Sequence, residues 1–425
     1  MNRVSVLFPA RQLTRDAFLL CFSAFFADLG YQGVAALFPL VIVLRLHAAV
    51  FWYGIITAVA YGAGAFFAYV GGLAGDRVDR KAVAIAGNTF IPLMAFAGLA
   101  HALWLSGLLF ALGWWARYFR TPARRALLVQ VTAPEQRGLA FGFLHALDIG
   151  GGMLSALAAL VMLASGVAIP MVMLCGVLPL VVSTALLFFV KRKTLYAEST
   201  PIQAASAGTV GSSAADRTLL TFLLASAMLY GFSFYNLGFP ILTATHGHAT
   251  RHAYELGVLT YLVYLGISAA SGYMLAAARL PALRSLWLLG YLPSALGSGL
   301  IGVSALLQMH AFAFYIFVGT LGFGMGSVET FEPTLVSSLV GSPTLSRGMG
   351  FLSVSRSIGQ FLSDVIMGIL FSVSRSAPYF YAFASAILAT LVLGVAEARY
   401  AKEGSRVGAG RSTAEHSDSS DEAFR

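Results

Sequence analysis

The chain has 425 residues, of which 58% are hydrophobic and only 11% are charged, and its formal net charge is +9. Soluble domains carry roughly 25% charged residues, so this composition and a mean hydropathy of +0.79 exclude an ordinary soluble protein. The composition indicates helices of about 20 residues that cross a lipid bilayer, where each span must satisfy its own backbone polar groups.

Apolar segments follow one another along nearly the whole sequence. Each is long enough to span a bilayer with some tilt. We therefore predict an all-α polytopic membrane protein with twelve transmembrane helices in two halves of six. The segments cover about 17–44, 50–72, 82–103, 104–123, 138–164 and 169–190, and then about 219–245, 254–276, 285–308, 311–331, 348–372 and 377–398.

The segment between the two sets opens with three basic residues and continues in Ser, Ala, Gly and Thr. This is a flexible-linker composition. The end of the chain is polar, acidic and rich in serine, which indicates disorder. We predict an N-terminal half at 1–190, a cytoplasmic linker at 191–218, a C-terminal half at 219–402 and a disordered cytoplasmic tail at 403–425.

The basic residues lie in alternate loops. If the N-terminus is inside, only Arg45, Arg251 and Arg375 of the 27 Lys and Arg residues fall outside, and Arg117 and Arg356 fall within spans. This asymmetry follows the positive-inside rule and predicts that both termini are cytoplasmic. It explains the net charge without nucleic-acid binding. We expect no cleavable signal, because the first apolar run is too long and lacks a small-residue cleavage site after it.

The two halves contain an internal repeat. At an offset of 211 residues, Gly113 aligns with Gly324 and Pro122 with Pro333. One residue of slippage then aligns Arg137 with Arg347. The repeat predicts that the two halves have the same fold and lie parallel in the membrane.

A charged loop, 72–81, joins the second and third apolar segments and reads GLAGDRVDRK. A basic loop after an apolar run is also a common cytoplasmic flank. Its position and its spacing, G-x-x-x-D-R-x-D-R-K, resemble the loop between helices 2 and 3 of the major facilitator superfamily of transporters. The usual pattern there is G-x-x-x-D-[RK]-x-G-[RK]-[RK]. Asp79 replaces the second glycine, and we expect it to take the positive φ that Asp tolerates better than most residues.

The resemblance implies an inner gate. In the family, the Asp and Arg of this loop contact neighbouring helix ends and hold the inner gate closed when the carrier faces outward. Gly72 opens the motif here, and the gate role falls on Asp76, Arg77, Arg80 and Lys81.

Other charged residues lie near the same predicted membrane edge. Arg117 resembles the arginine of family helix 4, although the glycines that usually follow it are absent. Glu329 and Glu332 are three apart and share one helix face. We predict them as part of the inner gate, and the alternative is an interfacial pair matched to Arg279 or Arg347.

Three ionisable residues, Asp28, Asp148 and Arg356, fall deep inside apolar segments. Each costs roughly 2.5–3.5 kcal/mol at a helix centre, so they should face one another or a water-filled cavity. A desolvated carboxylate there can take up a proton near neutral pH. A buried Asp–Arg pair that only locks the halves together is the alternative. The predicted cavity for substrate and protons contains Asp28, Gln32, His145, Asp148, Asn236 and Arg356.

Two further features bear on the cargo. Antiporters of the family often carry a Gly-Pro pair on helix 5, where this chain has Ser155 and Ala156, and the glycines at 150–152 are predicted to allow close helix packing. Aromatic residues crowd the seventh and eighth segments. We expect most to be core or lipid-facing, and any that line the cavity would favour an amphiphilic or aromatic cargo. They are Tyr230, Phe234, Tyr235, Tyr261 and Tyr264.

The remaining motifs favour a carrier over an enzyme. No P-loop lysine motif and no H-E-x-x-H motif occur. The predicted outer loop contains His246, His248 and His252. Solvated histidines are a simpler interpretation of this group than a metal site. We predict no catalytic residues, no cofactor and no metal.

Two short motifs, Asp28–Tyr31 and Arg120–Arg124, resemble a branch of bacterial carriers that are mostly exporters. The resemblance implies a monomeric secondary transporter of the cytoplasmic (inner) membrane that exports a small molecule by alternating access, coupled to protons. Two alternatives stay open: a nutrient or metabolite uptake carrier of the same fold, and a polytopic sensor or assembly protein that transports nothing.

Overall fold

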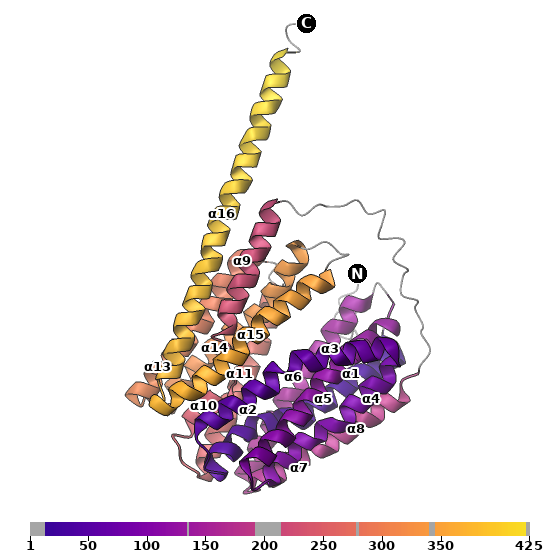
Figure 1. Cartoon of the computed structure of the whole chain (residues 1–425), viewed down its shortest axis with the longest axis vertical. Coiled ribbons are helices and arrows are strands. Elements are labelled where there is room, and N and C mark those ends of the chain that lie inside the picture. Colours follow the sequence, from indigo (N-terminus) through magenta and orange to yellow (C-terminus); the bar gives the residue numbers. More distant parts are fainter. Residues whose placement is uncertain (1–12, 134–135, 192–213, 278–279, 340–344, 422–425) are drawn as a thin grey trace.

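The computed structural model describes residues 13–133, 136–191, 214–277, 280–339 and 345–421. Every regular element in these ranges is a helix, which confirms the predicted all-α class (Figure 1). The N-terminal half contains α1 (Arg15–Leu40), η3 (Val41–Arg45), α2 (Val50–Gly62), α3 (Gly64–Arg77), α4 (Arg80–Phe90), η4 (Ile91–Leu99), α5 (Leu103–Gln130), α6 (Arg137–Ala164), α7 (Ile169–Cys175) and α8 (Val177–Phe189). The C-terminal half contains α9 (Ala214–Gly231), α10 (Gly238–Ala244), α11 (Arg251–Ala277), α12 (Ala282–Ser285), η7 (Leu286–Tyr291), α13 (Leu292–Leu307), α14 (Ala311–Leu339), α15 (Leu345–Val373) and α16 (Ala377–Asp421).

Ten helical runs in the described part of the chain are long and apolar enough to cross a membrane. Several are built from consecutive elements, such as α2 with α3 and α7 with α8. The predicted fourth and seventh spans are helical but are not among the ten, because α5 carries several arginines and α9 ends at Gly231, before α10. The count of twelve stays a prediction.

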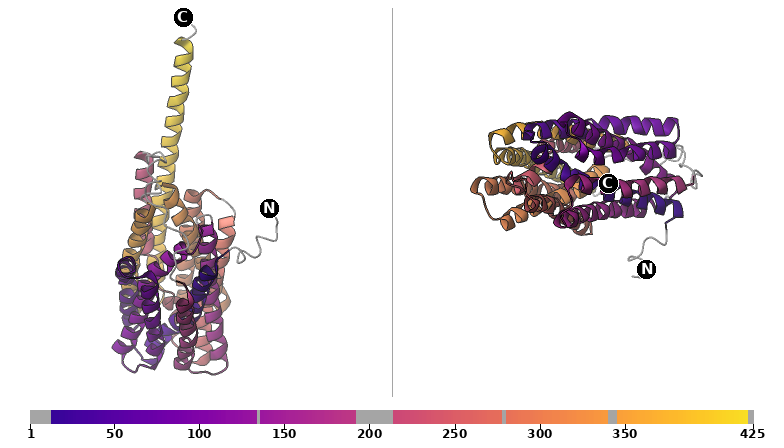
Figure 2. Two further views of the ribbon diagram at one scale, coloured as in Figure 1. Left: turned by 90° about the vertical axis from the view of Figure 1, so that its right-hand side faces the viewer. Right: turned by 90° about the horizontal axis from the view of Figure 1, so that it is seen from below.

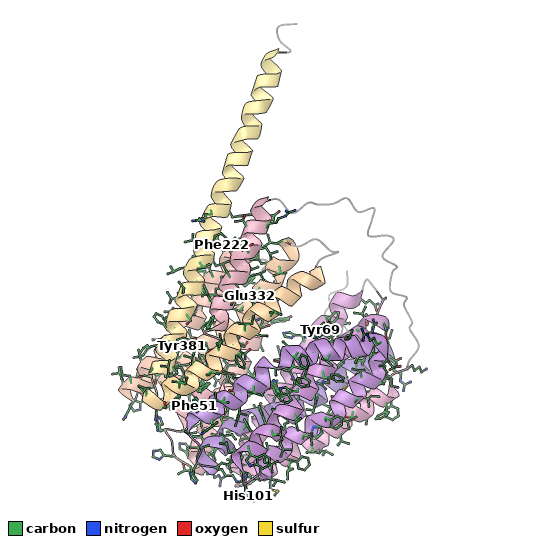
Figure 3. The ribbon with its side chains drawn as sticks, in the orientation of Figure 1. Phe51, Tyr69, His101, Phe222, Glu332 and Tyr381 are labelled. Atoms are coloured by element: carbon green, nitrogen blue, oxygen red, sulfur yellow. The ribbon has the colours of Figure 1, made fainter. Side chains whose placement is uncertain are left out.

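The outside of the bundle carries large apolar side chains. Tyr69, Trp104 and Phe312 are 71%, 71% and 78% exposed, and Figure 3 shows Tyr69 among the side chains that project from the N-terminal half. Water-soluble proteins rarely expose large apolar patches, and lipid chains would cover this surface. The chain is therefore a multi-pass membrane protein.

The two ends of the bundle differ in how the halves meet. We call the end where α8 finishes and α9 begins the linker end, and the end with the loop before α2 and the loop before α11 the loop end. One continuous apolar core joins the halves at the loop end and includes Phe38, Tyr53 and Phe239. Toward the linker end each half has its own core, one around Leu127 and the other around Val336. The halves lie together at the bottom of Figure 1 and diverge toward the linker end.

Glycines allow a close contact between the halves, where α2 packs on α15. A Cβ added to Gly54 would lie 2.5 Å from the carbonyl oxygen of Asp364 and 3.0 Å from the Cα of Gly368. The two backbones therefore touch without intervening side chains, as at other small-residue helix contacts in membranes.

The helices extend into the regions that the sequence predicted to be tail and linker. α16 continues as one helix to Asp421 and projects beyond the rest of the bundle, so the tail predicted to be disordered from residue 403 is helical as far as Asp421 (Figure 2). α9 begins at Ala214, inside the predicted linker, and residues 192–213 lie outside the described ranges.

Candidate functional site

Asp28 is the centre of a polar cluster on α1. Asp28 is only 4% exposed, and its carboxylate accepts hydrogen bonds from the Tyr31 hydroxyl and, at 3.1 Å, from Gln32 Nε2. The three residues share one helix face because their spacing is three and four. Arg117 of α5 donates from Nε to the Tyr31 hydroxyl at 2.8 Å and lies 5.0 Å from the ring centre of Trp114. Tyr31 therefore connects the carboxylate of Asp28 to the cation of Arg117.

The Asp28 cluster reaches the other half of the molecule through Gln32. The hydroxyl of Tyr261, on α11, donates to Gln32 Oε1 at 2.5 Å. Asp28 and Gln32 thus share a face of α1, and Gln32 contacts the other half through Tyr261.

Asn236 lies in a second polar contact between the halves. The Tyr53 hydroxyl of α2 donates to the side-chain oxygen of Asn236, and the backbone N–H of Asn236 donates to Asp364 Oδ1 at 2.9 Å. Asp364, on α15, is fully buried and was not identified from the sequence. It lies inside the predicted span 348–372, so the rule that selected Asp28 would also have selected it.

Arg356 pairs within its own half. Its guanidinium lies 2.8 Å from Glu329 and 3.5 Å from Glu332, both on α14, and 5.2 Å from the ring centre of Phe234. Glu332 is fully buried inside the C-terminal half, and the Tyr291 hydroxyl donates to it at 2.6 Å (Figure 3). The structure thus gives both glutamates a partner on the neighbouring helix. Of the two partners considered from the sequence, Arg279 and the side chain of Arg347 lie outside the described residues.

Asp148 also pairs within its own half. Its carboxylate lies 3.7 Å from Arg124 of α5, which is 4% exposed, while His145 on the same face of α6 is exposed. The predicted span ended at residue 123, but α5 continues to Gln130, so Arg124 lies inside the bundle. Arg120 is buried as well and donates to the side-chain oxygen of Asn88. In the described part of the chain, no Asp–Arg pair joins Asp148 or Asp28 to Arg356.

The two ion-pair clusters occupy corresponding helices of the repeat with the signs exchanged. In the N-terminal half, α5 supplies the cation and α6 the carboxylate. In the C-terminal half, α14 supplies the carboxylates and α15 the cation. The prolines that align in the sequence, Pro122 and Pro333, lie inside α5 and α14, which supports the same correspondence.

The charged loop at 72–81, called the gate loop below, contacts the end of α8 in the same half. Lys81 donates from Nζ to the carbonyl oxygens of Phe188 and Val190, at 2.8 and 2.6 Å, at the end of α8. Arg77 is exposed at the last position of α3. Asp76 lies in α3, but its side chain is outside the described residues.

The expectation that Asp79, which replaces the family's second glycine, has a positive φ is wrong. Its φ is −165°, which is extended, and its side chain accepts the backbone N–H of Ala82 at 2.7 Å as the N-cap of α4. An N-cap residue has extended backbone, and Asp is among the best caps, so no positive φ is needed. Gly72 has room for a side chain, since an added Cβ would meet only Pro122 at 3.6 Å, whereas one at Gly71 would lie 1.9 Å from the Phe119 oxygen.

The glycines of α6 differ in what they contact. An added Cβ at Gly151 would lie 2.4 Å from the backbone oxygen of Phe25 on α1, so this glycine allows close packing as predicted, whereas one at Gly150 would meet nothing within 4 Å. Ser155, at the position of the family's Gly-Pro pair, accepts the backbone N–H of Gly33 at 2.8 Å.

Aromatic residues line a cavity in the C-terminal half. The cavity is bordered by aromatic and serine side chains of α9, the break between α9 and α10, α11 and α13, so several aromatic residues noted in the sequence face an interior space. Its lining includes Tyr230, Ser233, Phe234, Tyr235, Tyr264, Ser294 and Ser298.

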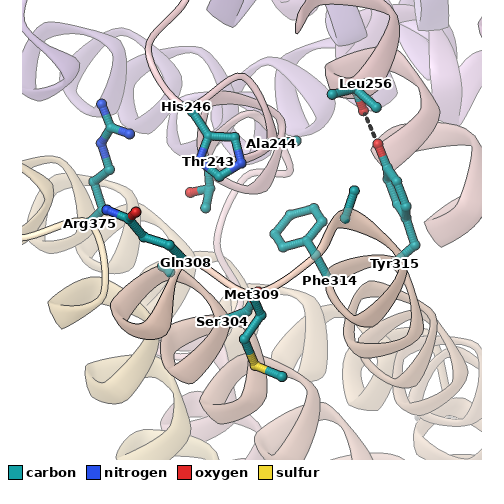
Figure 4. A pocket seen from close by; sticks show the side chains of 12 residues that line it. Thr243, Ala244, His246, Leu256, Ser304, Gln308, Met309, Phe314, Tyr315 and Arg375 are labelled. Atoms are coloured by element: carbon teal, nitrogen blue, oxygen red, sulfur yellow. Dashed lines mark hydrogen bonds between the residues drawn. The ribbon is translucent and has the colours of Figure 1, made fainter.

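A separate pocket opens at the loop end of the C-terminal half, away from the ion-pair clusters. Figure 4 shows His246, Gln308 and Arg375 around it, with Phe314 and Tyr315 on another side. His246 lines this pocket, whereas His248 and His252 do not. Within the described ranges, no group of three or more His, Cys, Asp or Glu side chains could hold a metal ion.

Comparison with known proteins identifies the family. The long apolar helices define a polytopic membrane protein. The model of the Major Facilitator Superfamily matches residues 20–363, and the chain belongs to this superfamily. No curated protein matches the sequence.

Solved structures share the fold at low sequence identity. A mutant of the peptide transporter POT is 13% identical, with a TM-score of 0.70 over 90% of this chain and 94% of that chain. The xylose transporter XylE from E. coli, in an inward-open conformation, is 11% identical, with a TM-score of 0.66 over 89% and 94%. A bacterial homolog to the human lysosomal transporter Spinster, inward-facing and unoccupied, is 16% identical, with a TM-score of 0.64 over 91% and 96%.

Proposed function

We propose that this protein moves a small molecule across the cytoplasmic membrane by alternating access. The observation that carries the proposal is the difference between the two ends: one apolar core joins the halves at the loop end, and separate cores lie at the linker end. A carrier of two repeats that rock around a central site is closed at one end while the other end is parted.

The linker end is proposed to face the cytoplasm. The excess of basic residues in its loops supports this orientation through the positive-inside rule. Two structural neighbours with the same fold are described as inward-open and inward-facing, which agrees with a cytoplasmic opening at the linker end.

The cargo is proposed to contact the polar groups where the halves meet, around Asp28, Gln32 and Tyr261. Asp28 and Asp148 are the candidates for the coupling proton, because both are carboxylates inside spans. Export is proposed from the resemblance of Asp28–Tyr31 and Arg120–Arg124 to bacterial exporters. The alternative is uptake with protons, since one structural neighbour is a D-xylose-proton symporter.

The test begins with a screen for compounds that raise the melting temperature of the purified protein, because a cargo that binds only the folded state must stabilise it. Compounds that do so are then loaded into proteoliposomes with an imposed pH gradient. Flux that follows the gradient supports a coupled carrier, and the sign of the response distinguishes export from uptake. Binding without flux would favour the sensor.

Asp28→Asn tests the role of the cavity carboxylate in the same assay. We expect the variant to lose dependence on the pH gradient while exchange of cargo without net proton movement survives. The matched control is Asp16→Asn, because Asp16 is also buried, but it lies at the linker end and accepts the backbone N–H of Lys191 at 3.2 Å. Gradient-driven flux that is unchanged in Asp28→Asn and in Asp148→Asn would remove both carboxylates from coupling.

A further inference from the structure

Asp364 is a buried carboxyl at the contact between the two halves. It lies on α15, has no exposed surface, and is covered by the residues of α2 around Gly54. One oxygen, Oδ1, accepts the backbone N–H of Asn236 at 2.9 Å, and the other, Oδ2, has no hydrogen-bond partner. Its position away from the gate loop and the ion-pair clusters leaves it without a role in the mechanism above.

No cation in the described part of the chain pairs with Asp364 or contributes to its electrostatic environment. The titratable groups on the facing helix α2 are Tyr53 and Tyr61, and the break before α10 contributes the neutral Asn236. α14 carries Glu329 and Glu332, but both pair with Arg356, eight residues before Asp364 and so about 12 Å away along α15. α9 and α16 also pack against α15, and their tyrosines Tyr230 and Tyr379 are hydrogen-bonded to Ser294 and Thr243.

The surroundings suit a protonated carboxyl. A buried carboxylate without a counter-charge is costly and normally becomes neutral instead. The hydroxyl of Thr57, which is fully buried beside the carboxyl, donates to the backbone oxygens of Tyr53 and Gly54, so its own oxygen can accept. A proton on Oδ2 would therefore have an acceptor, whereas the Thr57 hydroxyl could donate to an ionised Oδ2 only by giving up its bonds to the backbone oxygens of Tyr53 and Gly54.

We propose that Asp364 is a proton-binding residue that couples protonation to closure of the loop end. The carboxyl carries a proton while α2 packs against α15. When the halves part at this end, water reaches the carboxyl and the proton is released to the outside. The proposal rests on the proposed alternation of the halves, and it adds a proton site at their contact, distinct from the carboxylates near the cargo.

The test measures the loop end directly as a function of pH. Spin labels at Ala168 and Thr250, exposed residues of opposite halves, report the distance between the halves in a background with both cysteines replaced by serine. From about pH 5 to about pH 9, a range over which a buried carboxyl can titrate, the wild-type population with a long distance should rise. If closure binds one proton, the open-to-closed ratio should change by at most about tenfold per pH unit.

Three variants define the outcomes. Asp364→Asn should stay closed at every pH, and Thr57→Val, which removes the acceptor, should open at lower pH than the wild type, while Thr57→Ser should restore the wild-type response. Asp16→Asn is the control and should respond as the wild type does. A wild type with no pH response, or an unchanged response in Asp364→Asn, would overturn the proposal. Because the measurement needs no cargo, a failure to transport any compound would instead count against the proposed function.

Discussion

At the scale of single residues, Asp148 and Arg356 each form an ion pair with a residue on a neighbouring helix of the same half. Arg356 and Glu332 form one such pair: Glu332 has no exposed surface and Arg356 has a side chain that is 15% exposed. Removing one partner of a buried ion pair costs more than removing both, because the remaining charge stays desolvated.

Arg356→Met should therefore destabilise the protein by about 3–5 kcal/mol, which a thermal unfolding measurement would detect as a clear fall in melting temperature. The double variant Arg356→Met with Glu332→Gln should recover most of the loss, because the amide still accepts from Tyr291 and carries no charge. Arg251→Met is the control, since Arg251 pairs with Glu255 at an exposed site, where ion pairs contribute about 0–1 kcal/mol. Equal losses in the single and double variants would show that the pair does not act as a unit.

Asp79 gives a second residue-scale prediction. As the N-cap of α4, Asp79→Ala should cost about 1 kcal/mol, whereas Asp79→Gly, which restores the family pattern, should cost only a few tenths. The melting temperature should therefore fall further in Asp79→Ala than in Asp79→Gly. If glycine were the more damaging replacement, the capping explanation for Asp79 would be wrong.

Sequence reasoning found which residues are unusual but not which residues they bind. Asp28, Asp148 and Arg356 stand out because a charge inside an apolar span is costly. Their partners depend on how the helices are rotated and on where α5 ends, and neither is encoded locally. Arg124 was placed outside a span because the fourth apolar segment was ended at residue 123, although α5 continues to Gln130 with Pro122 inside it.

At the scale of helices, the close contact of α2 and α15 sets how firmly the loop end can close. Gly54→Ala would bring a methyl group against the backbone of α15, where the nearest atom would lie at 2.5 Å. We expect a lower melting temperature and a larger open population at the loop end, measured with the Ala168 and Thr250 labels.

Gly150→Ala is the matched control, because nothing lies within 4 Å of its added Cβ. In a helix interior, alanine is favoured over glycine by about 1 kcal/mol, so this variant should be neutral or more stable. The same behaviour in Gly54→Ala would mean that the backbones of α2 and α15 are free to move apart without cost.

The helices themselves were largely predictable, because long apolar runs have few alternatives in a bilayer. Breaks within spans were not, such as those between α2 and α3 or between α9 and α10. Glycines stand at both breaks, at Gly62 and Gly64 and at Gly231 and Gly238, but glycines also occur inside unbroken helices such as α6, so they do not mark a break by themselves. Glycine contacts were predicted for the run on α6, but Gly54 and Gly368 could be paired only once α2 and α15 were known to be neighbours.

At the scale of the whole molecule, the orientation in the membrane is a prediction that single labels can check. Cysteines placed one at a time at Ala205 and Thr250, in a background without native cysteines, should react with a membrane-impermeant reagent from the inside and from the outside respectively. The reason is the concentration of basic residues on the linker side. Labelling at position 205 from the outside would show that the linker end faces outward, opposite to the orientation proposed above.

Rocking of two rigid halves requires that one end of the molecule closes when the other end opens. Each half has its own core at the linker end, so the halves can move there without breaking apolar packing inside either one. A label pair at the linker end, Val78 and Leu280, should shorten in those molecules whose loop-end pair, Ala168 and Thr250, lengthens. The pair Val78 and Ala168 lies within the N-terminal half and should keep one distance throughout. If both inter-half distances lengthened together, the halves would be separating rather than rocking, and the difference between the shared and the separate cores would have to be explained without alternating access.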